Sequence, residues 1–218
     1  MTLFIINSMK RFLPVLAFIL IAAAAWLYGV NVRVPNPDPN HTHADFAVWI
    51  DGKQMDFSDD KYMEKKPTDE ESILLGQSSA TGSTRSALQV FLHLHDGNGR
   101  VIHRHKPDLG FVSFLRSIGF DLTDTCLITD EGKQVCNTEH DQWKLFVNGK
   151  VLTPYFQNYM FADGDHILLT NTSDVTEIKR ELSLMTDDAC LYSKTCPGRG
   201  APPVENCIAD PTVPCKIQ

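Results

Sequence analysis

The chain has 218 residues, 43% of them apolar, and a formal net charge of −7 at neutral pH. A chain of this length and composition can bury an ordinary hydrophobic core in one or two domains. The negative charge argues against nucleic acid as a partner, because phosphates are bound by clustered lysine and arginine.

The N-terminal region predicts a membrane anchor. Residues 12–30 form a run of 19 residues without a charge, and Lys10 and Arg11 precede it. An uncharged run of this length can span a bilayer, and basic residues ahead of it favour a cytoplasmic N-terminus. We therefore expect residues 1–33 to form a cytoplasmic stub and a single transmembrane helix, with the rest of the chain outside the cell membrane. A cleaved signal ending near residues 23–25 is the alternative.

A proline-rich spacer at residues 34–40 precedes a predicted folded domain at residues 41–172. Residues 42–50 alternate between apolar and polar side chains with the period of a half-buried strand. Asp51-Gly52 then predicts a hairpin turn. A His-x-His pair and an acidic residue share the face opposite the most apolar side chains of this strand: His41, His43 and Asp45.

Residues 58–86 are mostly polar and predict a long, flexible surface loop. Residues 88–105 then predict two strands joined by a turn, with two more His-x-His pairs. A loop over residues 97–99, with Gly99 in the left-handed conformation, buries the apolar side chains on one face and places both pairs on the other. A two-residue loop would shift the register by one and separate the pairs. The apolar pattern favours the first register, which joins four histidines on one face: His93, His95, His103 and His105.

A short helix is predicted to begin at Pro107-Asp108 and to end at Gly119. Its apolar stripe consists of Phe111, Phe114, Leu115 and Ile118. We expect this helix to cover the apolar face of the sheet and to leave the histidine face open.

The remainder of the chain predicts further hairpins and a second helix. Asn148-Gly149 is a turn signal between two short apolar runs, and a last strand is expected at residues 166–170. Residues 173–218 are expected to form a helix followed by a tail with four cysteines. Ser173 or Asp174 would cap that helix, whose apolar stripe would be Val175, Ile178, Leu182 and Met185.

All six cysteines lie beyond the predicted anchor, and an even number there indicates disulfides. Cys126 and Cys136 flank a predicted hairpin and would stand opposite each other, which is suitable geometry for a cross-strand disulfide. The other four predict two disulfides in the tail, and the sequence leaves three pairings open: Cys190, Cys196, Cys207 and Cys215.

Two parts of the chain resemble known groups of proteins. The motifs W-K-L-F-V-N-G-K and D-G-D-H-I-L-L-T at residues 143–170, with the earlier L-G-F-V-S-F-L-R-S-I-G, are similar to the β-grasp module of transcobalamin-type proteins. The front half, with H-x-H-A-D-F-x-V-W-I-D-G and H-L-H-D-G-N-G-x-V-I-H, is similar to exported prokaryotic proteins rich in His-x-His motifs, a group of uncharacterised function. The resemblance implies an α+β fold with a β-grasp-like mixed sheet of hairpins crossed by a helix. It includes no corrin-binding signature, which leaves cobalamin as a minor alternative.

The six paired histidines predict a metal site on the surface of the sheet. Imidazole suits Cu(II), Zn(II) and Ni(II), and copper or zinc is the usual choice outside the cytoplasm. Asp45 would orient a ligand by accepting its second N–H. The plain alternatives are solvated histidines on an exposed face and a pH-dependent interaction surface. His140 and His166 are expected to be structural.

The sequence favours a binding protein over an enzyme, without deciding between them. It contains no G-x-S-x-G, no H-E-x-x-H and no P-loop. The alternative function is a structural or protein-interaction module at the cell surface, with a surface protein as its partner and no metal. Such a module would tolerate the loss of His93 and His103, whereas a metal protein would lose its ion.

Overall fold

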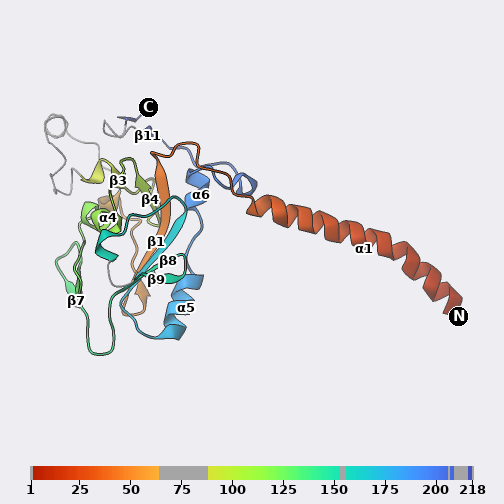
Figure 1. The fold of residues 1–218 in the computed structure, drawn as a ribbon, viewed down its shortest axis with the longest axis horizontal. Helices are drawn as coiled ribbons and strands as arrows, with labels where there is room; N and C mark the ends of the chain where they lie inside the picture. The colour runs from red at the N-terminus through yellow and green to blue at the C-terminus, as the bar shows by residue number, and fades with distance from the viewer. Residues whose placement is uncertain (1, 64–87, 153–155, 206, 209–215, 218) are drawn as a thin grey trace.

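The computed structural model describes residues 2–63, 88–152, 156–205, 207–208 and 216–217. Within these ranges it describes only the backbone of residues 2–14, 30, 207–208 and 216–217. It is an α+β protein whose main body is a mixed β-sheet with helices on both faces (Figure 1). The strands of this sheet are β1 (Thr42–Ile50), β2 (Lys53–Gln54), β3 (Leu92–His93), β4 (Val101–Arg104), β8 (Lys144–Val147), β9 (Lys150–Leu152) and β10 (Asp165–Thr170).

The strand β1 forms the centre of the sheet. The spatial order is β3, β4, β1, β10, β8 and β9, with β2 paired to the end of β1. The pair β1 and β10 is parallel, and the pairs that β1 forms with β4 and β2 are antiparallel. The predicted strand at residues 42–50 is confirmed, but eight of its nine residues are buried, so it is covered on both faces rather than on one.

Two predicted hairpin turns are confirmed. Asp51 and Gly52, between β1 and β2, have φ of 52° and 74°. Asn148 and Gly149, between β8 and β9, have φ of 50° and 75°. Left-handed conformation at both central residues is what a type I′ turn requires, and this turn matches the twist of the flanking strands.

The hairpin of β3 and β4 has the predicted register, because His93 pairs with His103. Its turn differs from the prediction: Asp96 and Gly97 are the left-handed residues, with φ of 53° and 69°. Gly99 is required for a different reason, since a Cβ there would lie 2.4 Å from the backbone carbonyl carbon of Phe57. The turn therefore packs directly against the chain that follows β2.

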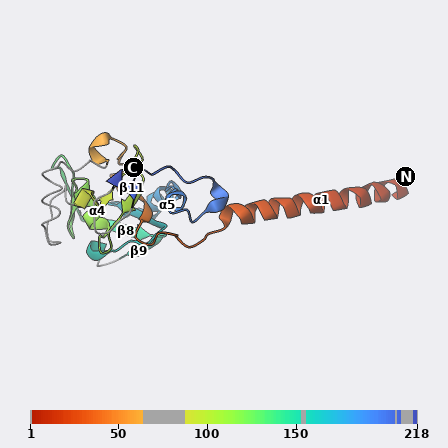
Figure 2. The ribbon, with the colours of Figure 1, turned by 90° about the horizontal axis from the view of Figure 1, so that it is seen from above.

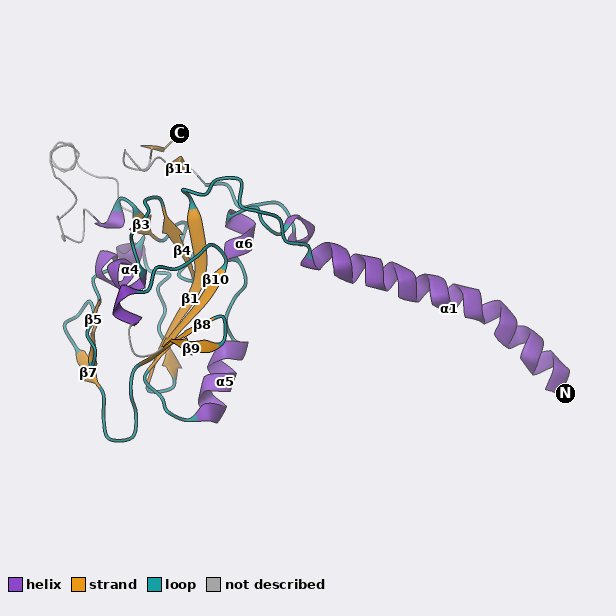
Figure 3. Cartoon of the chain, viewed as in Figure 1, coloured by secondary structure: helices purple, strands orange, loops and turns teal. Residues whose placement is uncertain are grey.

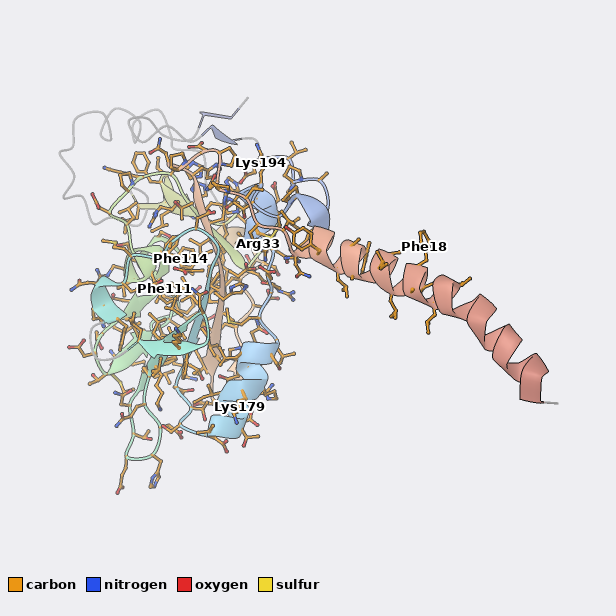
Figure 4. The ribbon with its side chains drawn as sticks, turned by 45° about the vertical axis from the view of Figure 1, so that its right-hand side comes forward. Phe18, Arg33, Phe111, Phe114, Lys179 and Lys194 are labelled. Carbon is orange, nitrogen blue, oxygen red and sulfur yellow. A yellow bond between two sulfur atoms is a disulfide. The ribbon has the colours of Figure 1, made fainter. Side chains whose placement is uncertain are left out.

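The main hydrophobic core lies between the sheet and the helix α4 (Phe111–Ser117). The four residues of the predicted stripe are fully buried in it, and Phe111 and Phe114 point from α4 into the body in Figure 4. The helix begins at Phe111, with Gly110 as its N-cap, and not at Pro107-Asp108. Gly119, at φ 94°, follows its end as predicted.

A small second sheet consists of β5 (Asp121–Leu122), β6 (Cys126–Ile128) and β7 (Gln134–Cys136). Cys126 pairs with Cys136 in the register of β6 and β7, and the two form a disulfide. This confirms the cross-strand disulfide. Leu122 and Leu127 of this sheet join the main core.

The helices α5 (Val175–Ser183) and α6 (Ala189–Tyr192) lie on the side of the sheet opposite α4 (Figure 3). Asp174 caps α5 as predicted, by accepting hydrogen bonds from the backbone N–H groups of Thr176 and Glu177. Its stripe is confirmed except at Val175, which is 63% exposed. Glu181, which the pattern did not place inside, is fully buried.

The tail holds one described disulfide, between Cys190 and Cys196. A 3-10 helix η3 (Pro197–Arg199) follows, and β11 (Cys207–Ile208) pairs with β12 (Lys216–Ile217). The predicted second disulfide of the tail involves Cys207, whose side chain is not described, and Cys215, which lies outside the described residues. Residues 64–87, most of the predicted loop, also lie outside them. The described start of that loop contains the 3-10 helix η1 (Asp60–Tyr62). Another 3-10 helix, η2 (Phe156–Asn158), lies near α4.

The predicted transmembrane helix is wrong. Residues 12–30 lie within the helix α1 (Thr2–Asn31), which projects from the body in Figure 1 and, from above, in Figure 2. Within the described residues, no helix combines the length and the apolar character that crossing a membrane requires. The side chains of α1 are described continuously only over residues 15–29, which is shorter than the about 20 apolar residues that a span requires. The predicted single-pass localisation and membrane contact fall with it. The mixed α+β sheet is observed, and its β-grasp-like assignment stays a prediction.

Candidate metal centre

Six histidines gather on one face of the sheet, where β1, β4 and β3 run side by side. His43 pairs with His103, and His103 pairs with His93, so three rings occupy the same level across three strands. Because side chains two residues apart share a face of a strand, the second members of the pairs lie on the same side. The sheet thus brings together every histidine of the predicted set: His41, His43, His93, His95, His103 and His105.

The rings form one continuous cluster. Ring centroids of His41 and His105 are 4.2 Å apart, and those of His95 and His103 are 4.5 Å apart. All six residues are buried, with exposed fractions of 8% or less.

The predicted open histidine face is therefore wrong. The segment around α6 covers this face, and the ring centroid of Tyr192 lies 4.8 Å from that of His103. The hydroxyl of Tyr192 accepts a hydrogen bond of 2.9 Å from Nδ2 of Asn98 in the β3–β4 turn. Sequence reasoning assigned polar side chains to solvent and gave the tail no position, so it missed this cover. The cluster is a buried centre rather than a surface site.

Glu205 is the residue that sequence reasoning missed entirely. Its Oε1 lies 3.0 Å from Nδ1 of His103, 3.1 Å from Nε2 of His43 and 3.6 Å from Nε2 of His41. Its side chain is only 10% exposed. It stands in a proline-rich tail 100 residues beyond the last paired histidine, and no motif or spacing there marks it as a ligand.

His43 is held by a chain of hydrogen bonds from the tail. The hydroxyl of Ser193 lies 2.7 Å from Nδ1 of His43 and donates to Oδ1 of Asp163 at 2.5 Å. Because its one hydrogen is directed to Asp163, Ser193 accepts the Nδ1–H of His43. Nε2 of His43 is thereby directed at Glu205, with its lone pair available when the ring is neutral.

His103 and His41 have ring nitrogens without hydrogen-bond partners among the described residues. Neither nitrogen of His103, which is fully buried, forms a hydrogen bond, and Nε2 of His41 forms none, although Glu205 Oε1 lies 3.0 Å from Nδ1 of His103 and 3.6 Å from Nε2 of His41. Buried polar atoms are nearly always hydrogen-bonded in folded proteins, and the exceptions need an explanation such as an ion.

His93 and His95 face each other through their Nε2 atoms at 3.0 Å. Nδ1 of His93 lies 2.6 Å from the carbonyl oxygen of Gln89, which can only accept, so Nδ1 carries the proton. In the neutral ring, Nε2 of His93 then presents a lone pair toward His95.

The electrostatics of the cluster favour neutral imidazoles. Burial, with the adjacent His43 ring, lowers the pKa of His41 to about 4. Burial and neighbouring rings also lower the pKa of four other histidines: His93, His95, His103 and His105. Burial alone would raise the pKa of Glu205, but its contacts with His43 and His41 lower it below its ordinary value. These five histidines therefore offer neutral nitrogens and Glu205 offers a carboxylate, the protonation states that metal ligands require.

Asp45 does not orient a histidine of the cluster, contrary to prediction. Its carboxylate accepts hydrogen bonds from the Thr186 hydroxyl and from the backbone N–H groups of Asp188 and Ala189, at 2.7, 2.8 and 2.9 Å. It thus fixes the start of α6 against β1. Burial raises the pKa of Asp45, which these bonds partly offset.

The two histidines left out of the prediction lie elsewhere. His140 is exposed in a loop. His166 lies near Asp45 and Asp187, with Nε2 3.4 Å from an oxygen of Asp187. Two arginines, Arg33 and Arg199, already pair with Asp187 at 2.7 Å each, so this carboxylate is neutralised without an ion.

The ligand atoms of the cluster fall into two groups within the described residues. His41, His43, His103 and Glu205 form the first, which we call the carboxylate site. His93, His95 and His105 form the second, which we call the three-histidine site. Within each group the ligand atoms lie within 4.8 Å of one another. Each group could hold a metal ion.

No family model, curated protein or solved structure matches the chain. What the centre can bind follows from its geometry and chemistry.

Proposed function

We propose that this protein binds a transition-metal ion, copper or zinc, through its buried histidine cluster. The observation that carries the proposal is His103. Its ring is fully buried between two other histidine-bearing strands. Nδ1 lies 3.0 Å from Oε1 of Glu205 without forming a hydrogen bond, and Nε2 has no hydrogen-bond partner in the described part of the chain. Leaving one buried polar group unsatisfied costs about 1–3 kcal/mol. An ion coordinated by this ring would supply the missing partner.

The donor set suits copper and zinc. It consists of imidazole nitrogens and one carboxylate, and both metals accept imidazole readily. The cysteines whose side chains the structure describes form two disulfides, Cys126–Cys136 and Cys190–Cys196, so they offer no thiolate. The 3.0–3.1 Å contacts from Glu205 to His103 and His43 are close to the spacing of neighbouring ligands around a four-coordinate ion, whose bonds measure about 2.0–2.1 Å.

The cover over the centre favours retention of the ion over rapid exchange. The tail supplies Glu205 as a ligand, Ser193 as a hydrogen-bond partner and Tyr192 as a wall. An ion bound to these groups is shielded from water, and it leaves only when the tail moves. We infer a role in holding or sensing a metal.

The test is a titration of the full, oxidised, metal-free chain with Zn(II) and Cu(II), with bound metal measured after dialysis. A His93→Ala/His103→Ala double variant removes one ligand from each group. His140→Ala is the matched control, because that histidine is exposed and belongs to neither group. We expect near-stoichiometric binding by the wild type and the control, and its loss in the double variant. A folded wild type that binds neither ion more tightly than millimolar would overturn the proposal and favour a protein-interaction module.

A further inference from the structure

The cluster contains more ligands than one four-coordinate ion uses. Zinc in proteins almost always takes four ligands in structural sites and three plus an open position in catalytic sites. The carboxylate site alone provides four ligand atoms and the three-histidine site provides three. One ion at either group would leave the ligands of the other group buried without a metal.

Each group shows its own contact of ligand spacing. In the carboxylate site, Oε1 of Glu205 lies 3.0 and 3.1 Å from nitrogens of His103 and His43. In the three-histidine site, the two Nε2 atoms of His93 and His95 lie 3.0 Å apart. Each contact joins two ligands of the same group, so the cluster has two points of convergence.

The two groups are in direct contact. The rings of His41 and His105, one from each group, have centroids 4.2 Å apart, and those of His103 and His95 are 4.5 Å apart. Ions held in both groups would be close neighbours. Their charges would repel each other with little screening, because the surroundings are buried.

The charges of the two groups differ. Glu205 brings a negative charge to the carboxylate site, whereas the ligands of the three-histidine site are neutral. A divalent ion is better stabilised beside the carboxylate than among neutral ligands in a buried region. The carboxylate site should therefore fill first, and the second ion should bind more weakly.

We propose that the cluster is a two-ion centre, with a first ion at His41, His43, His103 and Glu205 and a second at His93, His95 and His105. This inference rests on the proposed metal binding and adds the number of ions and their order. The carboxylate site has all four ligand positions occupied by the protein. The three-histidine site keeps one position for an exogenous ligand, such as water or a small anion.

The first experiment is calorimetric titration of the full metal-free chain with Zn(II), with metal content measured at saturation. We expect two ions per chain in two steps. Loss of an outer-shell group weakens metal affinity about 10–100-fold, and Glu205→Gln should weaken the tighter step by at least this much. It should leave the affinity of the weaker step unchanged. A His95→Gln/His105→Gln variant should keep the tighter step and lose the weaker one. His140→Gln should behave as the wild type.

The second experiment uses Cu(II) as the probe and needs no variant. Electron paramagnetic resonance should show an isolated Cu(II) signal at one equivalent. At two equivalents the signal should broaden or disappear, because adjacent unpaired spins couple. A signal that doubles without broadening would overturn the two-ion centre. One ion per chain, weakened by both sets of variants, would replace it with a single shared site and leave metal binding intact. No bound ion would refute the proposed function as well.

Discussion

Replacement of Ser193 by alanine tests how the tail prepares the centre. The Ser193 hydroxyl accepts the Nδ1–H of His43 at 2.7 Å and donates to Asp163 at 2.5 Å. Ser193 is 3% exposed and His43 is 1% exposed. Alanine therefore leaves a buried N–H without its acceptor. It also removes the group that directs Nε2 of His43 toward Glu205.

The expected effect has two parts. An unsatisfied buried donor costs about 1–3 kcal/mol. For a chain of this length, each 1 kcal/mol lowers Tm by about 2–4 °C, so the metal-free variant should melt about 2–12 °C below the wild type. Loss of an outer-shell partner of a metal ligand should weaken zinc binding about 10–100-fold, which corresponds to about 1.4–2.8 kcal/mol.

Thermal unfolding of the metal-free chain measures the first part, and zinc competition against a chromophoric chelator measures the second. Ser183→Ala is the matched control, because that residue is exposed and its hydroxyl donates to the Arg180 carbonyl oxygen within α5. The control should change neither quantity. If Ser193→Ala bound zinc as tightly as the control, His43 would not be a ligand oriented by the tail, and the carboxylate site as described would be wrong.

Three further predictions concern the fold around the centre. Burial raises the pKa of Glu181, and the Thr170 hydroxyl offsets part of this shift. As the pH rises above about 4.5, this side chain ionises in the unfolded state before it ionises in the folded state, so the free energy of unfolding falls progressively. Glu181→Gln should therefore raise Tm by about 2–4 °C per kcal/mol recovered at pH 8 and by little at pH 4, and an equal gain at both pH values would contradict the pKa argument. Gly99→Ala should destabilise the chain by about 1–3 kcal/mol in chemical denaturation, because its Cβ would meet the Phe57 backbone at 2.4 Å; Gly29→Ala, with nothing within 4 Å of the added Cβ, is its control, and equal stability of the two variants would argue against the close approach. Removing the Cys126–Cys136 disulfide with two serines should cost about 2–3 kcal/mol in the chain-entropy model, measured by the same denaturation, and an unchanged midpoint would show that the short loop restrains the unfolded chain little.

Local patterns predicted the elements that place the histidines. Alternation identified β1, and the apolar set around β3 and β4 fixed the register that pairs His93 with His103. This worked because a shift of one residue would move Leu92 and Ile102, both fully buried, to the opposite face. The two type I′ turns were also predictable, because few residues other than Asn, Asp and Gly adopt left-handed conformation readily.

Contacts distant in sequence were beyond such patterns. Glu205 and Ser193 reach the cluster only because the tail folds back across the sheet, and their spacing from His43 carries no signal. The same return of the tail explains why the face predicted to be open is buried. Gly99 was identified as special for the wrong reason, since its role is a close backbone approach rather than a positive φ. The N-terminal run was predicted as a membrane span from its length without a charge, but no helix among the described residues has both the length and the apolar character that a span requires.

X-ray absorption spectroscopy of the full chain loaded with one equivalent of zinc tests the central claim most directly, because it reports the ligands of the ion themselves. Coordination by the carboxylate site predicts a first shell of nitrogen and oxygen at about 2.0–2.1 Å, with the outer-shell scattering that imidazole rings produce. Glu205→Gln should alter this first shell, and His140→Gln should leave it unchanged. A shell of oxygen alone, without imidazole scattering, would place the ion outside the histidine cluster and contradict the claim.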